Sequence, residues 1–152
     1  MKETDRIQRL MNALYNGEPW IDVNILDTLS AIDPTNAAKQ IAPERNSIWQ
    51  TVNHLISWRQ TVLQRLQGEL ATTPDDNYMR DVKDTSDAAW QQTLQQLEET
   101  QQQWNSFLNN TDDTGLDKKY PASPYDHYDI IHGIIQHDAY HLGQIVLLTK
   151  LL

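Results

Sequence analysis

Apolar residues recur every three or four positions along most of the chain, which is the spacing of one helix face. Clusters of turn-forming residues at 33–36, 72–77 and 109–124 separate four long segments that carry this pattern. No segment alternates apolar and polar residues as a half-buried strand does. The pattern therefore predicts an all-α chain built from four helical segments.

Signals for helix ends divide the first two segments further. Pro19 lacks an amide hydrogen and clashes with the preceding turn, so the first segment is predicted to break or kink there. Asn46 or Ser47 is predicted to cap the second helix, and Gly68 indicates that its end is near.

The third and fourth segments are the longest. The third carries apolar residues from Trp90 to Leu108, and its other face is rich in glutamine. The fourth is predicted to begin with Ser123 as the cap, Pro124 at the first helical position and Asp126 as the capping-box acid. Four helices with short connections predict a four-helix bundle that forms a single domain over residues 1–152.

Composition excludes several functional classes. The 152 residues include 12 Lys+Arg and 21 Asp+Glu, which gives a formal charge of -9. Nucleic-acid binding is therefore not expected, because it depends on cationic side chains that neutralise phosphates. The absence of cysteine excludes disulfides and thiolate ligands, so any metal must be held by nitrogen and oxygen. No apolar run approaches the ~20 residues that span a bilayer, so a cytoplasmic protein without membrane contact is expected.

Two of the five histidines, His137 and His141, lie four residues apart in the fourth segment. At this spacing both imidazoles project from one side of a helix, about 6 Å apart along its axis, and can share one metal ion. Both are predicted to point into the bundle, where an unpartnered imidazole is costly. A pair of hydrogen-bonded core histidines is the alternative interpretation.

The sequence HDAYH at 137–141 lacks the glutamate of the zincin motif, and only 11 residues follow it, so a zincin protease is excluded. A third ligand must then come from upstream. His127 lies about 15 Å away along the helix, and His132 points to the opposite side. His54, in the middle of the second helix, remains. The predicted metal site is therefore His54, His137 and His141.

Other side chains are candidates to support or surround this site. Asp138, Glu44 and Gln144 are candidates to orient the imidazoles from behind. Four tryptophans are interpreted mainly as core fillers, namely Trp49, Trp58, Trp90 and Trp104. Three aromatic residues near loops are predicted to lie near the mouth of a pocket, namely Trp20, Tyr120 and Tyr125.

Two stretches resemble a known family. The sequences NSIWQTVNHLISW at 46–58 and HDAYHLGQI at 137–145, with GEPW at 17–20, are similar to those of the DinB/YfiT-like metalloenzymes. The resemblance follows the whole chain in order and length. One histidine in the second helix and His-x-x-x-His ahead of Gly-Gln in the fourth are its specific features.

The resemblance implies a four-helix bundle whose connectivity is a mirror variant of the up-and-down type. It also implies a divalent metal, most often zinc or nickel, with iron or manganese as alternatives, on His54, His137 and His141. Some relatives are transferases or isomerases that use small thiols such as bacillithiol or mycothiol. A small-molecule substrate is therefore expected, and a homodimer is the default association.

Three hypotheses remain open. In the first, the chain is a metal-dependent transferase or hydrolase in which a thiolate or water attacks a small electrophile. In the second, a metal stabilises a bundle that binds a partner or ligand without turnover. In the third, the chain is an acidic interaction module without metal.

Overall fold

The computed structural model describes residues 1–121 and 123–152. These residues contain seven helices and no strand. The four long helices are α1 (Glu3–Asn16), α4 (Ile48–Leu66), α5 (Asp87–Asn109) and α7 (His127–Thr149). The three short ones are α2 (Ile25–Ser30), α3 (Pro34–Ala38) and α6 (Asp113–Leu116). The predicted all-α fold class is confirmed.

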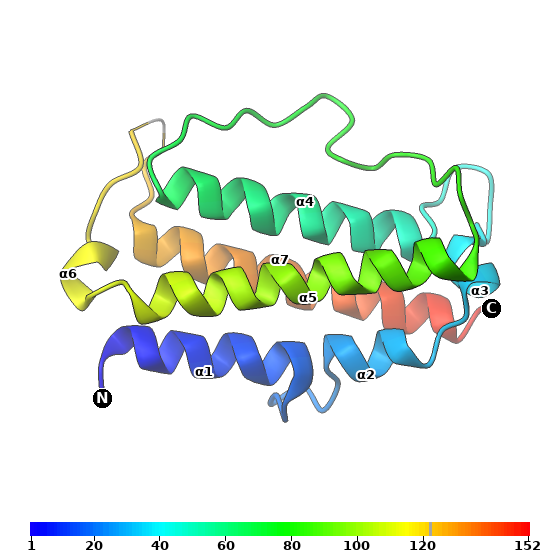
Figure 1. Cartoon of the computed structure of the whole chain (residues 1–152), viewed down its shortest axis with the longest axis horizontal. Coiled ribbons are helices and arrows are strands. Elements are labelled where there is room, and N and C mark those ends of the chain that lie inside the picture. Colours follow the sequence, from blue (N-terminus) through cyan, green and yellow to red (C-terminus); the bar gives the residue numbers. More distant parts are fainter. Residues whose placement is uncertain (122) are drawn as a thin grey trace.

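The long helices lie side by side, and α2 continues along the line of α1 (Figure 1). Helices α1 and α7 run in one direction, and α4 and α5 run in the other (Figure 1). Hydrogen bonds confirm that α4 and α5 are parallel. Trp49 Nε1 donates to Thr93 Oγ1 at 2.9 Å, and further along both helices Trp104 Nε1 donates to the carbonyl of Arg59 at 3.2 Å.

Residues 67–86 form the connection between these two parallel helices and run the length of the bundle (Figure 1). The expectation of short connections is wrong here, because a chain that leaves the end of α4 must return about 28 Å to begin a parallel helix. We call residues 67–86 the crossover.

Two apolar clusters fill the bundle, one toward each end. Trp49, Trp90 and Leu142 belong to one cluster, and Trp104 and Ile131 belong to the other. Trp49, Trp90 and Trp104 are thus core residues, as predicted. No helix within the described residues combines the length and hydropathy needed to cross a membrane.

The helix ends predicted from the sequence in the first half of the chain agree with the structure. The break predicted at Pro19 is confirmed, because α1 ends at Asn16 and α2 begins at Ile25. Ser47 caps α4, since its hydroxyl accepts from the amide of Gln50 and the side chain of Gln50 accepts from the amide of Ser47.

The predicted start of the fourth helix is wrong. Asp126 is the N-cap of α7 and forms a capping box with Asp129, while the hydroxyl of Ser123 accepts from the amide of Tyr125. The predicted breaks at 33–36 and 109–124 also contain short helices. Asp33 and Asp112 cap α3 and α6 through their carboxylates, because the same residue types that favour turns also favour N-caps.

Candidate metal centre

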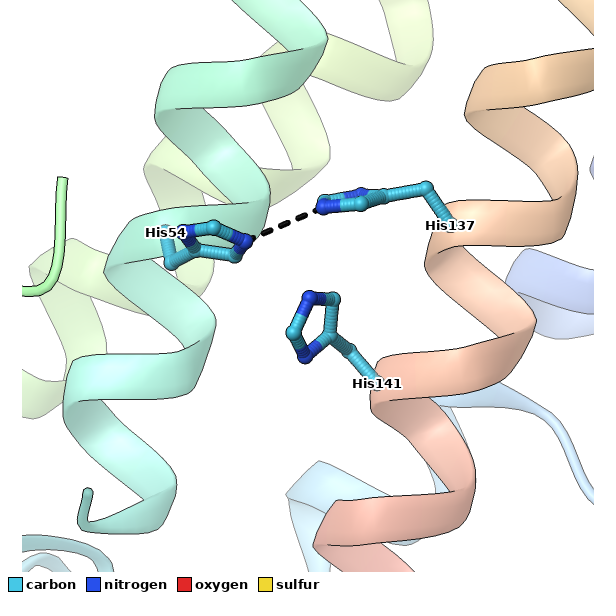
Figure 2. Close-up of side chains that lie close together, drawn as sticks. All are labelled: His54, His137 and His141. Carbon is cyan, nitrogen blue, oxygen red and sulfur yellow. Dashed lines mark hydrogen bonds between the residues drawn. The ribbon is translucent and has the colours of Figure 1, made fainter. Parts of the chain in front are cut away.

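Helices α4 and α7 bring three histidines together in the middle of the bundle (Figure 2). His54 comes from α4, and His137 and His141 come from successive turns of α7 (Figure 2). The capping boxes at Ser47 and Asp126 fix where the two helices begin. The predicted trio therefore shares one point in space.

The three rings are close enough to hold one ion. The ring centroids of His54 and His137 are 5.0 Å apart, and His141 lies 4.5 Å from each. One ligand nitrogen from each ring lies within 4.8 Å of the others. His54 Nε2 and His137 Nε2 are 3.0 Å apart. Two nitrogens bound tetrahedrally at about 2.0–2.1 Å would be ~3.3 Å apart, which is close to this spacing.

Two of the rings are oriented by hydrogen bonds through the nitrogen that faces away from the cluster. His54 Nδ1 lies 2.7 Å from the carbonyl oxygen of Asn77, which can only accept, so this nitrogen is the donor. His141 Nδ1 donates in the same way to Gln144 Oε1 at 2.7 Å. Protonation at Nδ1 leaves the lone pair on Nε2, as a metal-ligating imidazole requires.

Burial keeps these two rings neutral. Burial and, to a smaller extent, the charge of the neighbouring His137 lower the pKa of His141 to about 4, and the hydrogen bond to Gln144 opposes the shift. Burial also lowers the pKa of His54, against the opposing effect of the Asn77 carbonyl. His54 is 1% exposed and His141 is 7% exposed. Both rings are therefore in the ligating form at pH 7.

His137 differs from the other two, because its side chain is 26% exposed and its Nδ1 has no hydrogen-bond partner among the described residues. Asp138 Oδ1 lies 3.9 Å from this nitrogen and is itself buried without a hydrogen-bond partner among the described residues. Asp138 Oδ2 is occupied by Arg59, whose Nε and Nη2 both lie 2.8 Å away. The ion pair thus fixes Asp138 beside His137.

A cavity of about 530 Å³ adjoins the histidines. Trp58, Met79 and Tyr140 supply apolar wall, and Asn46 and Gln144 supply polar groups. Trp58 is partly buried and its ring centroid lies 5.9 Å from that of His137. This tryptophan is therefore part of the wall rather than only a core filler. A small molecule in the cavity could contact the three imidazoles directly.

This donor set fits a divalent ion. Three neutral imidazole nitrogens on a single site suit zinc, nickel, copper or iron better than hard cations such as magnesium, which prefer oxygen. Three protein ligands beside a cavity are typical of a catalytic metal site, whereas structural zinc sites usually have four.

Of the three residues predicted to orient the imidazoles, two lie beside the histidines and one does not. Gln144 bonds to His141, and Asp138 lies beside His137. Glu44 instead lines a neighbouring cavity with Leu147 and Leu151, and no hydrogen bond joins it to the histidines in the described chain.

The residues predicted near the pocket mouth lie elsewhere. Trp20 is 97% exposed in the loop between α1 and α2 and does not line the cavity beside the histidines. Tyr120 lines a different cavity at the end of α4, and Tyr125 is exposed. His132 packs against Tyr128 outside the cluster, with ring centroids 4.4 Å apart and ring planes tilted by 51°, as its helix position predicts.

Two residues that matter for the site were not predicted. Asn77 has a positive φ of 50° and lies in the crossover, where its carbonyl accepts from His54 and its side chain accepts from Trp58 Nε1 at 3.0 Å. Arg59 is buried in the middle of α4. Asn77 could not be predicted because every residue type has a backbone carbonyl, so the sequence does not indicate which carbonyl will accept a hydrogen bond. Arg59 was not predicted because an arginine in a helix is ordinarily expected at the surface.

Residues 22–145 match the family model of the DinB superfamily. No curated protein and no solved structure matches the chain. The matched range includes all three histidines and the crossover.

Proposed function

Because this chain belongs to the DinB superfamily, we propose that it is a metal-dependent enzyme that transfers a thiol or water to a small electrophilic substrate. The observation that carries the proposal is the convergence of His54, His137 and His141 beside a cavity. His54 and His141 have their second nitrogens committed to hydrogen bonds, so the ligating nitrogens are already aimed inward.

A divalent ion on these nitrogens would supply a Lewis acid that makes a bound thiol or water more acidic. The chain's own residues orient the donors and limit water. Asn77 holds the ring of His54, Gln144 holds the ring of His141, and the half-buried Trp58 covers one side of the cavity.

The cavity supports a small-molecule substrate. Its volume of about 530 Å³ falls within the range of ordinary ligand pockets, about 300–1,000 Å³. Thiol-dependent relatives make a low-molecular-weight thiol the first nucleophile to test. In the transfer, a bond forms between sulfur and the electrophilic carbon, the leaving group departs with its bonding pair, and the thiol proton goes to solvent.

Metal content is the first test. Protein purified without a nickel column should contain about one equivalent of zinc, nickel, iron or manganese per chain. His141→Ala should abolish binding, whereas His132→Ala, on the same helix but outside the cluster, should retain it. Fewer than about 0.1 equivalents in the wild-type protein would refute both metal hypotheses.

Turnover is the second test. The loaded protein should accelerate the reaction of a thiol such as bacillithiol or mycothiol with chlorodinitrobenzene, in which a carbon–sulfur bond replaces the carbon–chlorine bond. His141→Ala should lose this activity and keep its helical circular dichroism, and His132→Ala should keep both. A metal-stabilised bundle without turnover would instead unfold when the metal is removed and would show no rate above background with any thiol.

A further inference from the structure

A second cavity, of about 490 Å³, lies between the end of α4 and the start of α7. The charged residues that line it are all basic or potentially basic: Arg65, Lys118, Lys119 and His127. The whole chain has only 12 Lys+Arg and a formal charge of -9. The arginine and the two lysines therefore oppose the charge of the rest of the molecule. We call this cavity the basic pocket.

Arg65 is held in place on several sides. Its Nε donates to the carbonyl of Ala71 at 3.0 Å, and its Nη2 donates to Thr73 Oγ1 at 3.1 Å. Its guanidinium carbon lies 5.5 Å from the ring centroid of Trp58 and 6.0 Å from that of Tyr120. These contacts leave Nη1 with no hydrogen bond to the described residues. A fixed guanidinium with an unused donor loses little conformational entropy when it binds an anion.

The lysines are held against the start of α7 by backbone pairing. The amide of His127 donates to the carbonyl of Lys118 at 2.8 Å, and Lys119 forms an isolated antiparallel bridge with Asp126. Lys119 Nζ also lies 3.4 Å from a carboxylate oxygen of Asp126. Lys118 has no ion pair with any described residue, so its charge is available to a ligand.

The remaining wall is suited to an organic molecule. The buried Leu66, the exposed Leu70 and Tyr120 all line the pocket. His127 is partly buried, and burial followed by the charge of Lys118 lowers its pKa, so that it is a neutral donor at pH 7. The walls thus offer apolar surface beside cationic and neutral donors.

We propose that the basic pocket is a binding site for the anionic group of a small organic molecule, a phosphate or a carboxylate, held by Arg65, Lys118 and His127. The proposal does not depend on the metal centre, because none of these residues belongs to the histidine cluster. Charge-assisted hydrogen bonds from Arg and Lys are the usual means by which proteins bind both groups.

Inorganic phosphate and succinate are the probes, each titrated into the full chain at constant ionic strength and followed by amide shifts in NMR spectra. Saturable shifts at residues 118 and 127 are expected with at least one of the two, and the tighter probe identifies the preferred anion. Lys118→Glu should weaken binding roughly fivefold or more, since one charge contact is worth about 1 kcal/mol. Lys39→Glu makes the same charge change at another exposed lysine and should leave affinity within roughly twofold of wild type.

Three results would overturn the proposal. The first is the absence of saturable shifts with both anions. The second is an equal weakening in the two lysine variants, which would indicate a general charge effect. The third is a loss of binding in His141→Ala, which would mean that the probe binds a metal at the histidine cluster. Unchanged circular dichroism in Lys118→Glu, expected because this side chain is exposed, keeps the comparison valid.

Discussion

Replacement of Arg59 by methionine tests how the bundle is held together at the level of the histidines. The guanidinium bonds to Asp138 of α7, to Thr100 and Gln101 of α5, and lies 5.5 Å from the ring centroid of Tyr15 in α1. Since Arg59 itself belongs to α4, one side chain contacts all four long helices. Methionine keeps much of the side-chain length and removes the charge.

The expected cost follows from burial. The side chains of Arg59 and Asp138 are each 1% exposed, so the variant leaves a carboxylate in the core without a counter-charge. Removing one partner of a buried ion pair typically costs about 3–5 kcal/mol. Against a total stability of about 5–15 kcal/mol, Arg59→Met should lower the unfolding midpoint by about 6–20 °C.

Urea unfolding of a double-mutant cycle measures this. The double variant Arg59→Met/Asp138→Leu removes both charges and should recover most of the lost free energy of unfolding. Arg80→Met is the matched control, because it breaks an exposed ion pair with Asp76 at 2.9 Å and should cost less than about 1 kcal/mol. The reasoning is refuted if Arg59→Met costs no more than Arg80→Met, or if the double variant loses the sum of the two single losses.

Three further predictions concern the histidine cluster and the crossover. Gln144→Leu removes the acceptor of His141 and should weaken metal binding about tenfold in competition with a chelating dye. Gln136→Leu, exposed on the same helix, should have no effect, and equal affinities in the two variants would contradict the role of Gln144. In the metal-free protein the folded pKa of His141 is about 4 and the unfolded value is about 6.5, so its contribution to stability is complete above pH 6.5 and is lost as the pH falls toward 4. Urea unfolding should therefore show a smaller loss over this range in His141→Gln than in wild type, and parallel losses would count against the shift. Asn77→Ala and Asn77→Gly both lose the bond to Trp58, but alanine must also adopt a positive φ, so it should be less stable than glycine by about 1 kcal/mol in urea; equal stability would argue against the left-handed backbone.

Local pattern predicted the long helices well, because helical spacing and capping residues act within one or two turns. Asn46 and Ser47 are such local signals: both were candidates to cap α4, and Ser47 is the cap that forms a capping box with Gln50. The start of α7 was misplaced because Ser123 and Asp126 both have capping chemistry. The choice between them depends on the bridge between Lys119 and Asp126, which only the folded chain forms.

The parallel arrangement of α4 and α5 had no local signal. Residues 72–77 contain the turn-forming types of a short loop, and their composition does not say how far the chain travels. The direction of α5 is fixed by contacts between distant residues, such as Trp49 with Thr93. The spacing of apolar residues therefore predicted the helices but not the directions in which they run in the bundle.

The three histidines could be predicted because helix geometry alone excludes His127 and His132 from a shared ion. The residues that orient these histidines differ in how far along the sequence they lie from the histidine they contact. Gln144 lies one turn beyond His141 and was a candidate on that ground, whereas Asn77 acts through a backbone carbonyl across 23 positions of sequence. Residue type predicts side-chain donors and acceptors, but carbonyl positions follow from the path of the chain.

The crossover consequently belongs to the candidate metal centre as much as the two helices do. Asn77 and Tyr78 have positive φ values of 50° and 61°, a conformation that non-glycine residues adopt only where other contacts hold it. Those contacts are the bonds of Asn77 to His54 and Trp58, and of the Tyr78 hydroxyl to Thr61 at 2.7 Å. A ligand that favours the Nδ1-protonated form of His54 also favours the bond to the Asn77 carbonyl. By linkage, metal binding and the left-handed turn must stabilise each other, so a change that loosens the crossover weakens the metal site without touching a ligand.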